Sequence, residues 1–444
     1  MQVAEHIFKS YDIRGRYPDE VNTDVAYAVG NQLVGMLGGA RFLVVHDARI
    51  SGPELTEALA AGIEDAGAVA IVAGLGPTDL FYYGCATHNC AGVMITASHN
   101  PPDQNGFKIV RKMPHALSLD QGLSELRRRI KEEPPQTREG GRQETIDLED
   151  GFVELISGLV GTFEMPRVAV IDTGNGASGL VALKLRDRLN LSADVIFYDP
   201  DGRFPNRGPD PMKPENHRFL SDRVQSDLAA LGVALDGDGD RAIIIGPDGV
   251  MIPGDFVAAL LSRNALKRMP GAPVLYDVRC SRVVRDMILE YGGKPVVNRV
   301  GHVYMKSRLA EEHAAFAGEL SGHYYFPEFF GADSGILAAL YMIRLASEMG
   351  AEWKKTLDAL HAKYHVSGEI NFKVTDAAAR LVQLRQQYSG ARISEIDGVT
   401  FDFGDWWFNV RSSNTEPLLR LNLEAPTEQQ LKQRVEEVSH ILEG

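Results

Sequence analysis

Apolar segments that end in an aspartate occur three times in the first three-quarters of the chain. The segments are FLVVHD, VAVID and PVLYD, which end at Asp47, Asp172 and Asp277. Each is followed by a turn and a helical pattern, and then by a second apolar segment, AVAIVAGLG, ADVIFYDPDG or GKPVVNRVGH. Strands that alternate with helices in this way predict a mostly parallel α/β sheet, and the spacing is that of whole domains.

The helix expected after the first of these segments carries the clearest pattern. Leu55, Leu59 and Ile63 recur at helical spacing and predict a buried face. Ser51 stands before this stripe with a glutamate three residues later, which is the spacing of a capping box. We therefore expect Ser51 to cap the helix and Gly67 to end it, because glycine is favoured just after a helix.

The pattern changes after about residue 367. A helical stretch, DAAARLVQLRQQY, precedes the strands VTFDF and WFNVR, a polar loop, the strand LLRLNLEA and the helical segment TEQQLKQRVEEVSHIL. This order predicts a small α+β domain after three topologically similar, mixed or parallel α/β domains. The clearest linker is the charged segment KEEPPQTREGGRQE, residues 131–144. We expect domains at 1–145, 146–251, 252–366 and 367–444.

Composition narrows the class of protein. The 444 residues carry a formal net charge of −14, which argues against nucleic-acid binding because phosphate backbones require a basic surface. A few Arg and Lys side chains in one cleft could still bind a small phosphorylated ligand. No apolar run approaches the roughly 18 residues that span a bilayer, and the start lacks a signal-peptide pattern. The three cysteines form no CxxC pair, so we expect a cytoplasmic protein without a membrane partner.

Three loops rich in reactive groups follow predicted strands: MITASHNP, ALDGDGDR and AGELSGH. In open α/β sheets, ligands bind beyond the carboxyl ends of the strands. Three domains that each present such a loop could therefore surround one central cleft.

DGDGDR is the strongest metal signal. Asp236, Asp238 and Asp240 alternate with glycines, which allow the backbone to fold tightly around an ion. Three carboxylates so close together repel one another unless a cation neutralises them, and hard oxygen ligands suit Mg²⁺ or Ca²⁺. An EF-hand does not fit, because Arg241 and Pro247 stand where that loop has Gly and Glu. The alternative for this motif is a solvated acidic turn.

TASHNP places Ser98 at a strand end beside His99. The motif is not the GxSxG turn of acyl-transfer hydrolases. A serine that faces a Mg²⁺ site can instead carry a phosphoryl group, whose charge Lys108 in GFKIV is placed to neutralise. The alternative is a polar turn ahead of two prolines.

Two further loops offer groups that bind sugars and phosphates. In GELSGH, Glu319, Ser321 and His323 suit hydrogen bonds to vicinal sugar hydroxyls, although Ser-Gly turns are common. RSSNTEP could surround a phosphate with hydroxyls, backbone N–H groups and a bidentate guanidinium; a hairpin turn is the alternative. The residues of this loop are Arg411, Ser412, Ser413, Asn414 and Thr415.

Taken together and in this order, the loops resemble those of the α-D-phosphohexomutase family, close to its phosphomannomutase/phosphoglucomutase branch. The resemblance runs through FKSYDIRG, TASHNP, DGDGDR, VGH, GELSGH and RSSNTEP, and covers essentially the whole chain. It implies three similar α/β domains and a fourth α+β domain around a central cleft. It also implies a phosphoserine enzyme that interconverts hexose 1-phosphates and 6-phosphates through a hexose 1,6-bisphosphate.

The resemblance assigns a role to each matching position. Ser98 is similar to the phosphoserine, which is also a metal ligand through its phosphate, and the three aspartates of DGDGDR to the Mg²⁺ ligands. Residues expected near the transferring phosphoryl group are Tyr11, Arg14, Lys108 and Arg241. The sugar is expected at Glu319, Ser321 and His323, and the non-reacting phosphate at Arg411, Ser413, Asn414 and Thr415.

His302 is the first candidate for the general base and His99 the second. Arg279, another expected substrate contact, stands where relatives usually have Lys, which changes the hydrogen-bond geometry; His46 also departs from the family pattern.

Several alternatives stay open at this point. Phosphoglucosamine mutase is the nearest one within the family, although Leu320 in GELSGH is of the apolar class seen in the mannose/glucose branch. A sugar phosphatase would transfer the phosphoryl group to water, and a sugar-phosphate-binding regulator would not react at all. The residues do not distinguish mannose from glucose as the preferred sugar, and they predict neither the oligomeric state nor whether Ser98 carries phosphate.

Overall fold

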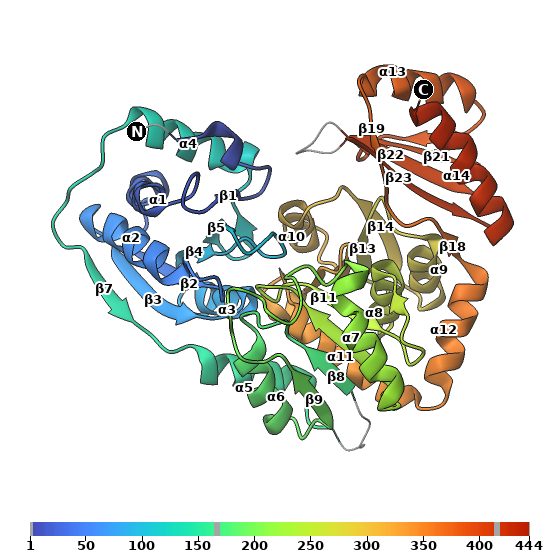
Figure 1. Ribbon diagram of the computed structural model, residues 1–444, viewed down its shortest axis with the longest axis horizontal. Coiled ribbons are helices and arrows are strands. Elements are labelled where there is room, and N and C mark those ends of the chain that lie inside the picture. The colour runs from blue at the N-terminus through green and yellow to red at the C-terminus, as the bar shows by residue number, and fades with distance from the viewer. Residues whose placement is uncertain (1–2, 164–168, 413–417, 444) are drawn as a thin grey trace. The chain divides into compact units, whose positions relative to one another are not determined.

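The computed structural model describes residues 3–163, 169–412 and 418–443 (Figure 1). It divides into two compact units. The first comprises Met1–Ile252, Lys306–Glu311 and Ser321–Gly350, and the second Pro253–Met305, Glu312–Leu320 and Ala351–Gly444. Within the described ranges, no helix combines the length and the apolar character needed to cross a membrane.

The first sheet of the first unit is mixed, with strand order β1-β5-β4-β2-β3-β7 and β6 paired with β5. Neighbours among β2, β3, β4 and β7 are parallel, whereas β5 is antiparallel to β4 and to β1. Its strands are β1 (Ile13–Arg16), β2 (Arg41–His46), β3 (Val69–Leu75), β4 (Ala91–Ile95), β5 (Gln104–Lys112), β6 (His115–Ala116) and β7 (Arg142–Thr145). The accompanying helices are the 3₁₀ turns η1 (Glu5–Ile7) and η2 (Leu119–Gln121), α1 (Thr23–Leu37), α2 (Gly52–Asp65), α3 (Thr78–Thr87) and α4 (Leu123–Glu132).

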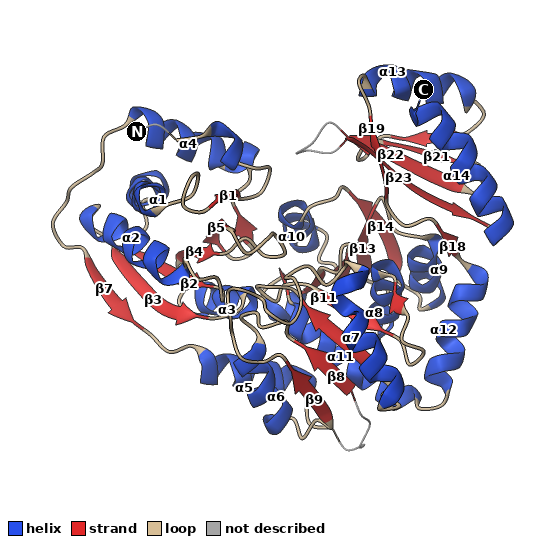
Figure 2. Ribbon diagram, viewed as in Figure 1, coloured by secondary structure: helices blue, strands red, loops and turns tan. Residues whose placement is uncertain are grey.

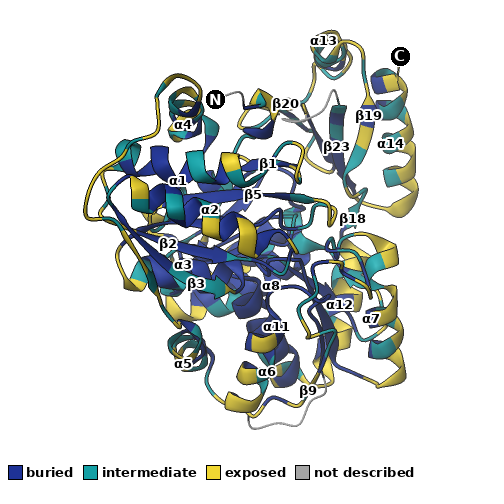
Figure 3. Cartoon of the chain, turned by 60° about the vertical axis from the view of Figure 1, so that its left-hand side comes forward, coloured by how far each residue is buried: buried dark blue, intermediate teal, exposed yellow. Residues whose placement is uncertain are grey.

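One core joins this sheet to α1, α2 and α4. Val44, Val93 and Ile109 from the strands pack in one cluster with Leu59 of α2 and Leu126 of α4. Figure 3 shows β2 and β5 as buried strands. Burial of such alternating apolar positions is the main term that holds the sheet and the helices together.

The second sheet of the first unit has the order β12-β11-β10-β8-β9. Its strands β8, β9 and β10 are parallel, and β11 and β12 continue antiparallel. The bounds are β8 (Ala169–Asp172), β9 (Ala193–Ile196), β10 (Leu231–Leu235), β11 (Ala242–Ile245) and β12 (Met251–Ile252), with α5 (Glu149–Val160), α6 (Gly179–Arg188) and α7 (Pro214–Ser226). The first unit also contains the antiparallel pair β16 (Tyr324–Phe326) and β17 (Ala332–Asp333), η3 (Pro327–Phe329) and α11 (Gly335–Met349).

The second unit contains a parallel arrangement and an antiparallel sheet (Figure 2). β14 (Lys294–Asn298), β13 (Pro273–Asp277) and β15 (Phe316–Gly318) are parallel. The antiparallel sheet has the order β18-β23-β22-β21-β20, with β19 also paired to β23. Its strands are β18 (His365–Val366), β19 (Ile370–Lys373), β20 (Arg392–Ser394), β21 (Val399–Asp402), β22 (Trp407–Ser412) and β23 (Leu418–Ala425). The helices are α8 (Gly254–Arg268), α9 (Arg282–Glu290), the start of α10 (His302–Glu311), α12 (Glu352–Lys363), α13 (Ala377–Gln387) and α14 (Glu428–Glu443).

The predicted fold class is confirmed: mixed or parallel α/β arrangements precede a small α+β domain. The apolar stripe expected on the first α/β helix is also confirmed, because Leu55, Leu59 and Ile63 of α2 are fully buried. The four domain boundaries and the central cleft stay predictions.

Two local predictions were wrong. Ser51 does precede α2, but its side chain makes no capping bond to the helix; its Oγ accepts a hydrogen bond from Asn105 Nδ2 at 2.8 Å instead. The segment 131–144 is not wholly a linker, because α4 continues to Glu132 and β7 begins at Arg142 and pairs in parallel with β3. Tertiary partners decided both outcomes, since neither Asn105 nor β3 is a sequence neighbour of the segment concerned.

The three aspartates that end the apolar segments are buried and paired with arginines. Asp47 bonds Arg49, Asp172 bonds Arg207 through Nε at 2.9 Å to both carboxylate oxygens, and Asp277 bonds Arg279. Hydrogen-bonded guanidinium partners make the burial of these charges tolerable. The repeated aspartate therefore anchors the end of each first strand.

Asp255, at the start of α8, makes the unfolding free energy of the protein depend on pH. It accepts hydrogen bonds from the Ser281 and Phe256 N–H groups, but burial raises the pKa of its carboxyl to about 6. A pKa above the unfolded value means that the folded state binds the proton more tightly, so this stabilisation is present at low pH and is lost as pH rises through about 4 to 6.

The unfolding free energy of Asp255→Asn, measured relative to that of the unchanged protein, should rise by about 2 kcal/mol from pH 4.5 to pH 7.5. The reason is that only the unchanged protein loses stability as Asp255 ionises. Urea unfolding at both pH values measures this difference, with Asp222→Asn on the exposed side of α7 as the control. A gap between the two proteins that does not change with pH would contradict the assignment.

Candidate active site

Ser98 lies in the turn that follows β4, and the backbone there is unusual. Its φ is +51°, in the left-handed region that non-glycine residues seldom occupy. Its N–H donates to Thr96 Oγ1 at 2.7 Å, and Thr96 in turn donates to Asp47 Oδ2 at 2.6 Å. Strain of this kind persists only where neighbours determine the conformation, and here it fixes the direction in which the Ser98 hydroxyl points.

Two arginines hold the rest of this turn. Arg49 is fully buried and donates to the carbonyl oxygens of Ser98, Asn100, Pro101 and Gln104 at 2.6–2.8 Å. Arg14 of β1 bonds Asp12 and donates to the carbonyl of Ala97 and to the side chain of Asn100, the last two each at 3.0 Å. The sequence predicted Arg14 at the site but not Arg49, although the position of Arg49 two residues after the strand-ending aspartate was a usable signal.

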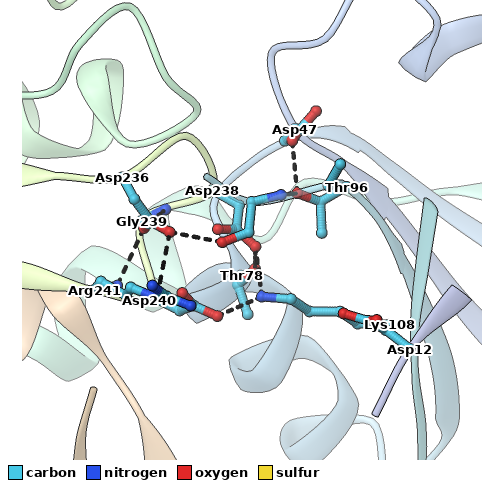
Figure 4. Close-up of polar contacts among 12 residues, drawn as sticks. Asp12, Asp47, Thr78, Thr96, Lys108, Asp236, Asp238, Gly239, Asp240 and Arg241 are labelled. Atoms are coloured by element: carbon cyan, nitrogen blue, oxygen red, sulfur yellow. Dashed lines mark hydrogen bonds and ion pairs between the residues drawn. The ribbon is translucent and has the colours of Figure 1, made fainter. Parts of the chain in front are cut away.

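The three aspartates of DGDGDR follow β10 and are buried. Asp236 Oδ2 accepts a hydrogen bond from Ser98 Oγ at 2.7 Å, which joins two loops 138 residues apart in the sequence. Its other oxygen accepts from the N–H groups of Gly239 at 3.1 Å and Arg241 at 3.2 Å. Figure 4 labels Asp236 together with Gly239 and Arg241. The structure therefore brings Ser98 and the aspartates together, as the sequence predicted.

Lys108 of β5 reaches the same cluster. Its Nζ lies 2.7 Å from Asp238 Oδ2 and also donates to Asp240 Oδ2 (Figure 4). Burial opposes its charge, but Asp238 and Asp240 together raise the pKa of Lys108 above its usual value. Thr78, at the start of α3, donates its hydroxyl to Asp238 Oδ2 at 2.7 Å and its N–H to the Asp238 carbonyl at 2.8 Å. Thr78 is a second residue that sequence analysis missed.

The donor set fits a hard cation. One carboxylate oxygen from each of Asp236, Asp238 and Asp240 lies within 4.8 Å of the others, and Asp238 Oδ1 is buried without a hydrogen-bond partner. Burial, together with the charges of Asp238 and Asp240, raises the pKa of Asp236 well above its usual value. A Cβ at Gly237 would come within 2.6 Å of the Ser98 carbonyl, so glycine is needed for the close approach of the two loops. Oxygen ligands with an unused lone pair are those that Mg²⁺ or Ca²⁺ prefers.

Three more predicted residues surround the cluster. His99 Nδ1 lies 3.1 Å from Ser98 Oγ, and burial, with Arg241 next in effect, lowers the pKa of His99 well below its usual value. Arg241 Nε donates to His323 Nε2 at 3.3 Å, and the same nitrogen of His323 lies 3.4 Å from Asp240 Oδ1. His99, Arg241 and His323 thus belong with Ser98 and the aspartates in the first unit.

The predicted sugar loop GELSGH is divided between the two units. Ser321 Oγ lies 3.1 Å from His323 Nδ1 in the first unit. Glu319, in the second unit, accepts from the N–H of Gly301 at 3.0 Å and lies 3.9 Å from Arg279 Nη2. The expectation that one loop presents Glu319, Ser321 and His323 to a sugar stays a prediction.

Arg279 and Arg411 lie in the second unit around one carboxylate. Arg411 Nη2 bonds Glu369 Oε2 at 2.9 Å, and Arg279 Nη1 lies 3.7 Å from the same oxygen. Arg420 Nη1 bonds Glu369 Oε1 at 3.1 Å. Neither Glu369 nor Arg420 could be predicted from the sequence, because no motif connects the start of the last domain to RSSNTEP.

The remaining predicted residues are placed as follows. Tyr11 is partly exposed ahead of β1, and His302 is partly exposed at the start of α10 in the second unit. Of the RSSNTEP loop, Arg411 and Ser412 end β22, whereas Ser413, Asn414 and Thr415 lie outside the described residues. The roles assigned to all of these side chains stay predictions.

Comparison with known families covers nearly the whole chain. Four domain families described as phosphoglucomutase/phosphomannomutase match: alpha/beta/alpha domain I at residues 5–136, domain II at 162–249, domain III at 253–364 and the C-terminal domain at 369–441. They occur in the order I, II, III and C-terminal along the sequence.

Curated relatives match over similar lengths. A protein of Xanthomonas campestris named phosphohexose mutases is 38% identical, with 98% of this chain and 99% of the relative covered. Phosphomannomutase/phosphoglucomutase of Pseudomonas aeruginosa is 36% identical, with 96% and 93% covered. Phosphomannomutase of Escherichia coli is 35% identical, with 94% of each chain covered.

Solved structures agree in fold. A phosphoglucomutase/phosphomannomutase family protein of Burkholderia thailandensis superposes with a TM-score of 0.91 at 33% identity, covering 99% of this chain and 98% of the other. An Aspergillus fumigatus N-acetylphosphoglucosamine mutase, solved in complex with GlcNAc-6P and magnesium, has a TM-score of 0.62 at 14% identity, covers 99% and 95%, and supports the fold alone. Full-length relatives above 30% identity and four matched domains in order establish that the chain belongs to the phosphoglucomutase/phosphomannomutase family.

Proposed function

We propose that the chain is a phosphohexomutase that interconverts hexose 1-phosphates and 6-phosphates of mannose, glucose or both through phosphorylated Ser98. The observation that carries the proposal is the 2.7 Å hydrogen bond from Ser98 Oγ to Asp236 inside a buried carboxylate triplet. The names of the relatives support the same reaction class.

The chain's own residues define the chemistry of the transfer. In the first step, the bond between phosphorus and Ser98 Oγ breaks while a bond forms to the free hydroxyl of the hexose monophosphate, whose proton passes to a base. His302 is our first candidate for this base and His99 the second. The product is a hexose 1,6-bisphosphate, which turns over and returns its other phosphoryl group to Ser98.

Side chains that already contact the aspartates would stabilise the negative charge of the transferring phosphoryl group. Lys108 and Arg241 flank the aspartates and would hold the phosphoryl oxygens as negative charge moves between them. A Mg²⁺ ion held by Asp236, Asp238 and Asp240 would supply further neutralisation of that charge. Arg14 and Arg49 keep the Ser98 turn rigid, so that the hydroxyl does not have to be reoriented for each transfer.

A mutase also needs a place for the phosphate that does not react. Arg411 in the second unit is our candidate, with the predicted contacts Ser413, Asn414 and Thr415 beside it in the sequence. Glu319, Ser321 and His323 are proposed to bind the sugar hydroxyls, with Tyr11 and Arg279 as further substrate contacts.

The test compares three substrates under one set of conditions. The chain, with Mg²⁺ and a glucose 1,6-bisphosphate primer, is incubated with mannose 1-phosphate, glucose 1-phosphate or glucosamine 1-phosphate, and both isomer and inorganic phosphate are measured. We expect conversion of the first, the second or both to the 6-phosphate without release of phosphate. Free phosphate without isomer would overturn the mutase in favour of a phosphatase, and preference for glucosamine 1-phosphate would make the chain a phosphoglucosamine mutase.

A further inference from the structure

Glu369 lies between β18 and β19 with its carboxylate among three arginines of the second unit. Arg411 and Arg420 bond its two oxygens at 2.9 and 3.1 Å, and Arg279 lies at 3.7 Å. Its side chain is about a quarter exposed, at 23%. Burial works against its charge, but Arg279 and Arg411 lower the pKa of Glu369, so the carboxylate is ionised at neutral pH.

The other carboxylates near these arginines are held differently. Asp277 accepts hydrogen bonds from the N–H groups of Arg279 and Leu320 as well as from the Arg279 guanidinium. Glu319 accepts from the Gly301 N–H. In the described part of the chain, the hydrogen bonds of the Glu369 carboxylate go to guanidinium groups alone. Among the described residues, no backbone N–H therefore holds this carboxylate in position.

The backbone beside Glu369 has room to change. Gly368 has a φ of +67°, and no atom lies within 4 Å of the position that a Cβ would take there. Glycine lowers the barrier to a change in φ and ψ at this point, as it does at the hinge residues of many proteins. A change of φ and ψ at Gly368 is the movement by which we expect the carboxylate to withdraw.

The charges around Glu369 explain what its presence does. Three guanidinium groups (Arg279, Arg411 and Arg420) are balanced by three carboxylates (Asp277, Glu319 and Glu369). A monoanion gains little by displacing Glu369, because it brings the arginines no more negative charge than the carboxylate already does. A phosphoryl dianion offers a second charge and three oxygens for the fork geometry of arginine, so it can displace the carboxylate.

We propose that Glu369 is an internal stand-in for the substrate's non-reacting phosphate: it occupies the anion position at Arg411 and Arg420 in the free protein, yields it to a phosphoryl dianion and excludes monoanions. The proposal rests on the proposed function only in assigning Arg411 to a phosphate. Glu369 is thus a specificity-determining residue that acts through the arginines and does not touch the reacting atoms.

The test measures anion binding without any assay of turnover. Inorganic phosphate and acetate are titrated calorimetrically into the full chain and into Glu369→Gln, which keeps the shape of the side chain and removes its charge. We expect Glu369→Gln to bind phosphate about tenfold more tightly and to bind acetate measurably where the unchanged chain does not. Glu395→Gln, an exposed position in the same domain, should change neither affinity.

A further variant locates the effect, and a second one guards against misfolding. Adding Arg411→Gln to Glu369→Gln should cancel the gain, because the phosphate would lose its main partner. If thermal unfolding shows that Glu369→Gln does not fold, Glu369→Asp replaces it: the shorter side chain withdraws the charge, and phosphate should bind a few-fold more tightly. Equal or weaker phosphate binding in the folded variant would overturn the proposal and leave Glu369 as a group that merely orients the arginines.

The proposed mutase reaction and the proposed role of Glu369 can fail separately. A chain that shows the phosphate gain but does not isomerise any sugar phosphate would disprove the mutase and leave the role of Glu369 standing. An active mutase whose Glu369→Gln variant binds phosphate no better would do the reverse.

Discussion

Replacing Ser98 with alanine should lower the rate of isomerisation by about 10⁴-fold or more, because the proposed covalent carrier of the phosphoryl group is lost. The substitution removes one hydroxyl group and should leave the backbone of the turn in place. Ser98 Oγ bonds Asp236 and lies beside His99, whereas the backbone of the turn is held by Arg49 and Thr96. The fold should therefore survive the loss of the hydroxyl. Steady-state rates with hexose 1-phosphate and primer measure the effect. After incubation with the bisphosphate primer, mass spectrometry should find an added phosphoryl group in the unchanged chain and not in Ser98→Ala.

The matched control is Ser226→Ala, an exposed serine at the end of α7, which should keep full activity. Retention of full activity in Ser98→Ala would remove the proposed mechanism. Loss of activity in a variant that still binds sugar phosphate would exclude a purely binding role, since a regulator needs no phosphoryl carrier.

Removing the divalent ion should have the second largest effect. With a chelator in excess, we expect activity to fall to background and to return on addition of Mg²⁺, because Asp236, Asp238 and Asp240 then repel one another and leave the transferring charge unneutralised. Asp238→Asn should lower activity by about 10²- to 10³-fold and weaken Mg²⁺ binding. Asp238 is the informative position, since one of its oxygens is buried without a partner while Lys108 and Thr78 hold the other.

Calorimetric titration with Mg²⁺ separates this effect from a folding defect. Asp248→Asn, in the exposed turn between β11 and β12, is the control and should bind Mg²⁺ as the unchanged chain does. Activity that persists after chelation would rule out the ion as a participant in the reaction, whatever the carboxylates do for the fold.

The local chemistry of this site was readable from short stretches of sequence. DGDGDR predicts a cation site because closely spaced carboxylates on a glycine-rich turn are typical of metal-binding loops. TASHNP could be placed at a strand end because the apolar segment before it is unbroken. Both predictions depend on covalent neighbours alone, and the structure brings Ser98 and Asp236 together as expected.

Contacts made by residues far apart in the sequence were not readable. Arg49 binds four carbonyls of a turn about 50 residues away, and Glu369 meets Arg411 42 residues along the chain. No periodicity or motif marks such partners, because each depends on how two strands happen to end side by side. Ser51 illustrates the same limit in reverse: its capping-box spacing was correct, but Asn105 offered a competing hydrogen bond.

The order of the α/β elements, a candidate cation-binding loop, a candidate serine for phosphoryl transfer and the family resemblance could all be predicted from the residues alone. These depend on hydrophobic periodicity and on side-chain chemistry within a few residues. Which arginines hold the serine turn, which residues of GELSGH belong to each unit and which carboxylate pairs with Arg411 emerged only from the folded structure. Those outcomes depend on charges that become neighbours when strands pack, since burial makes every unpaired charge costly and so selects its partner from the whole chain.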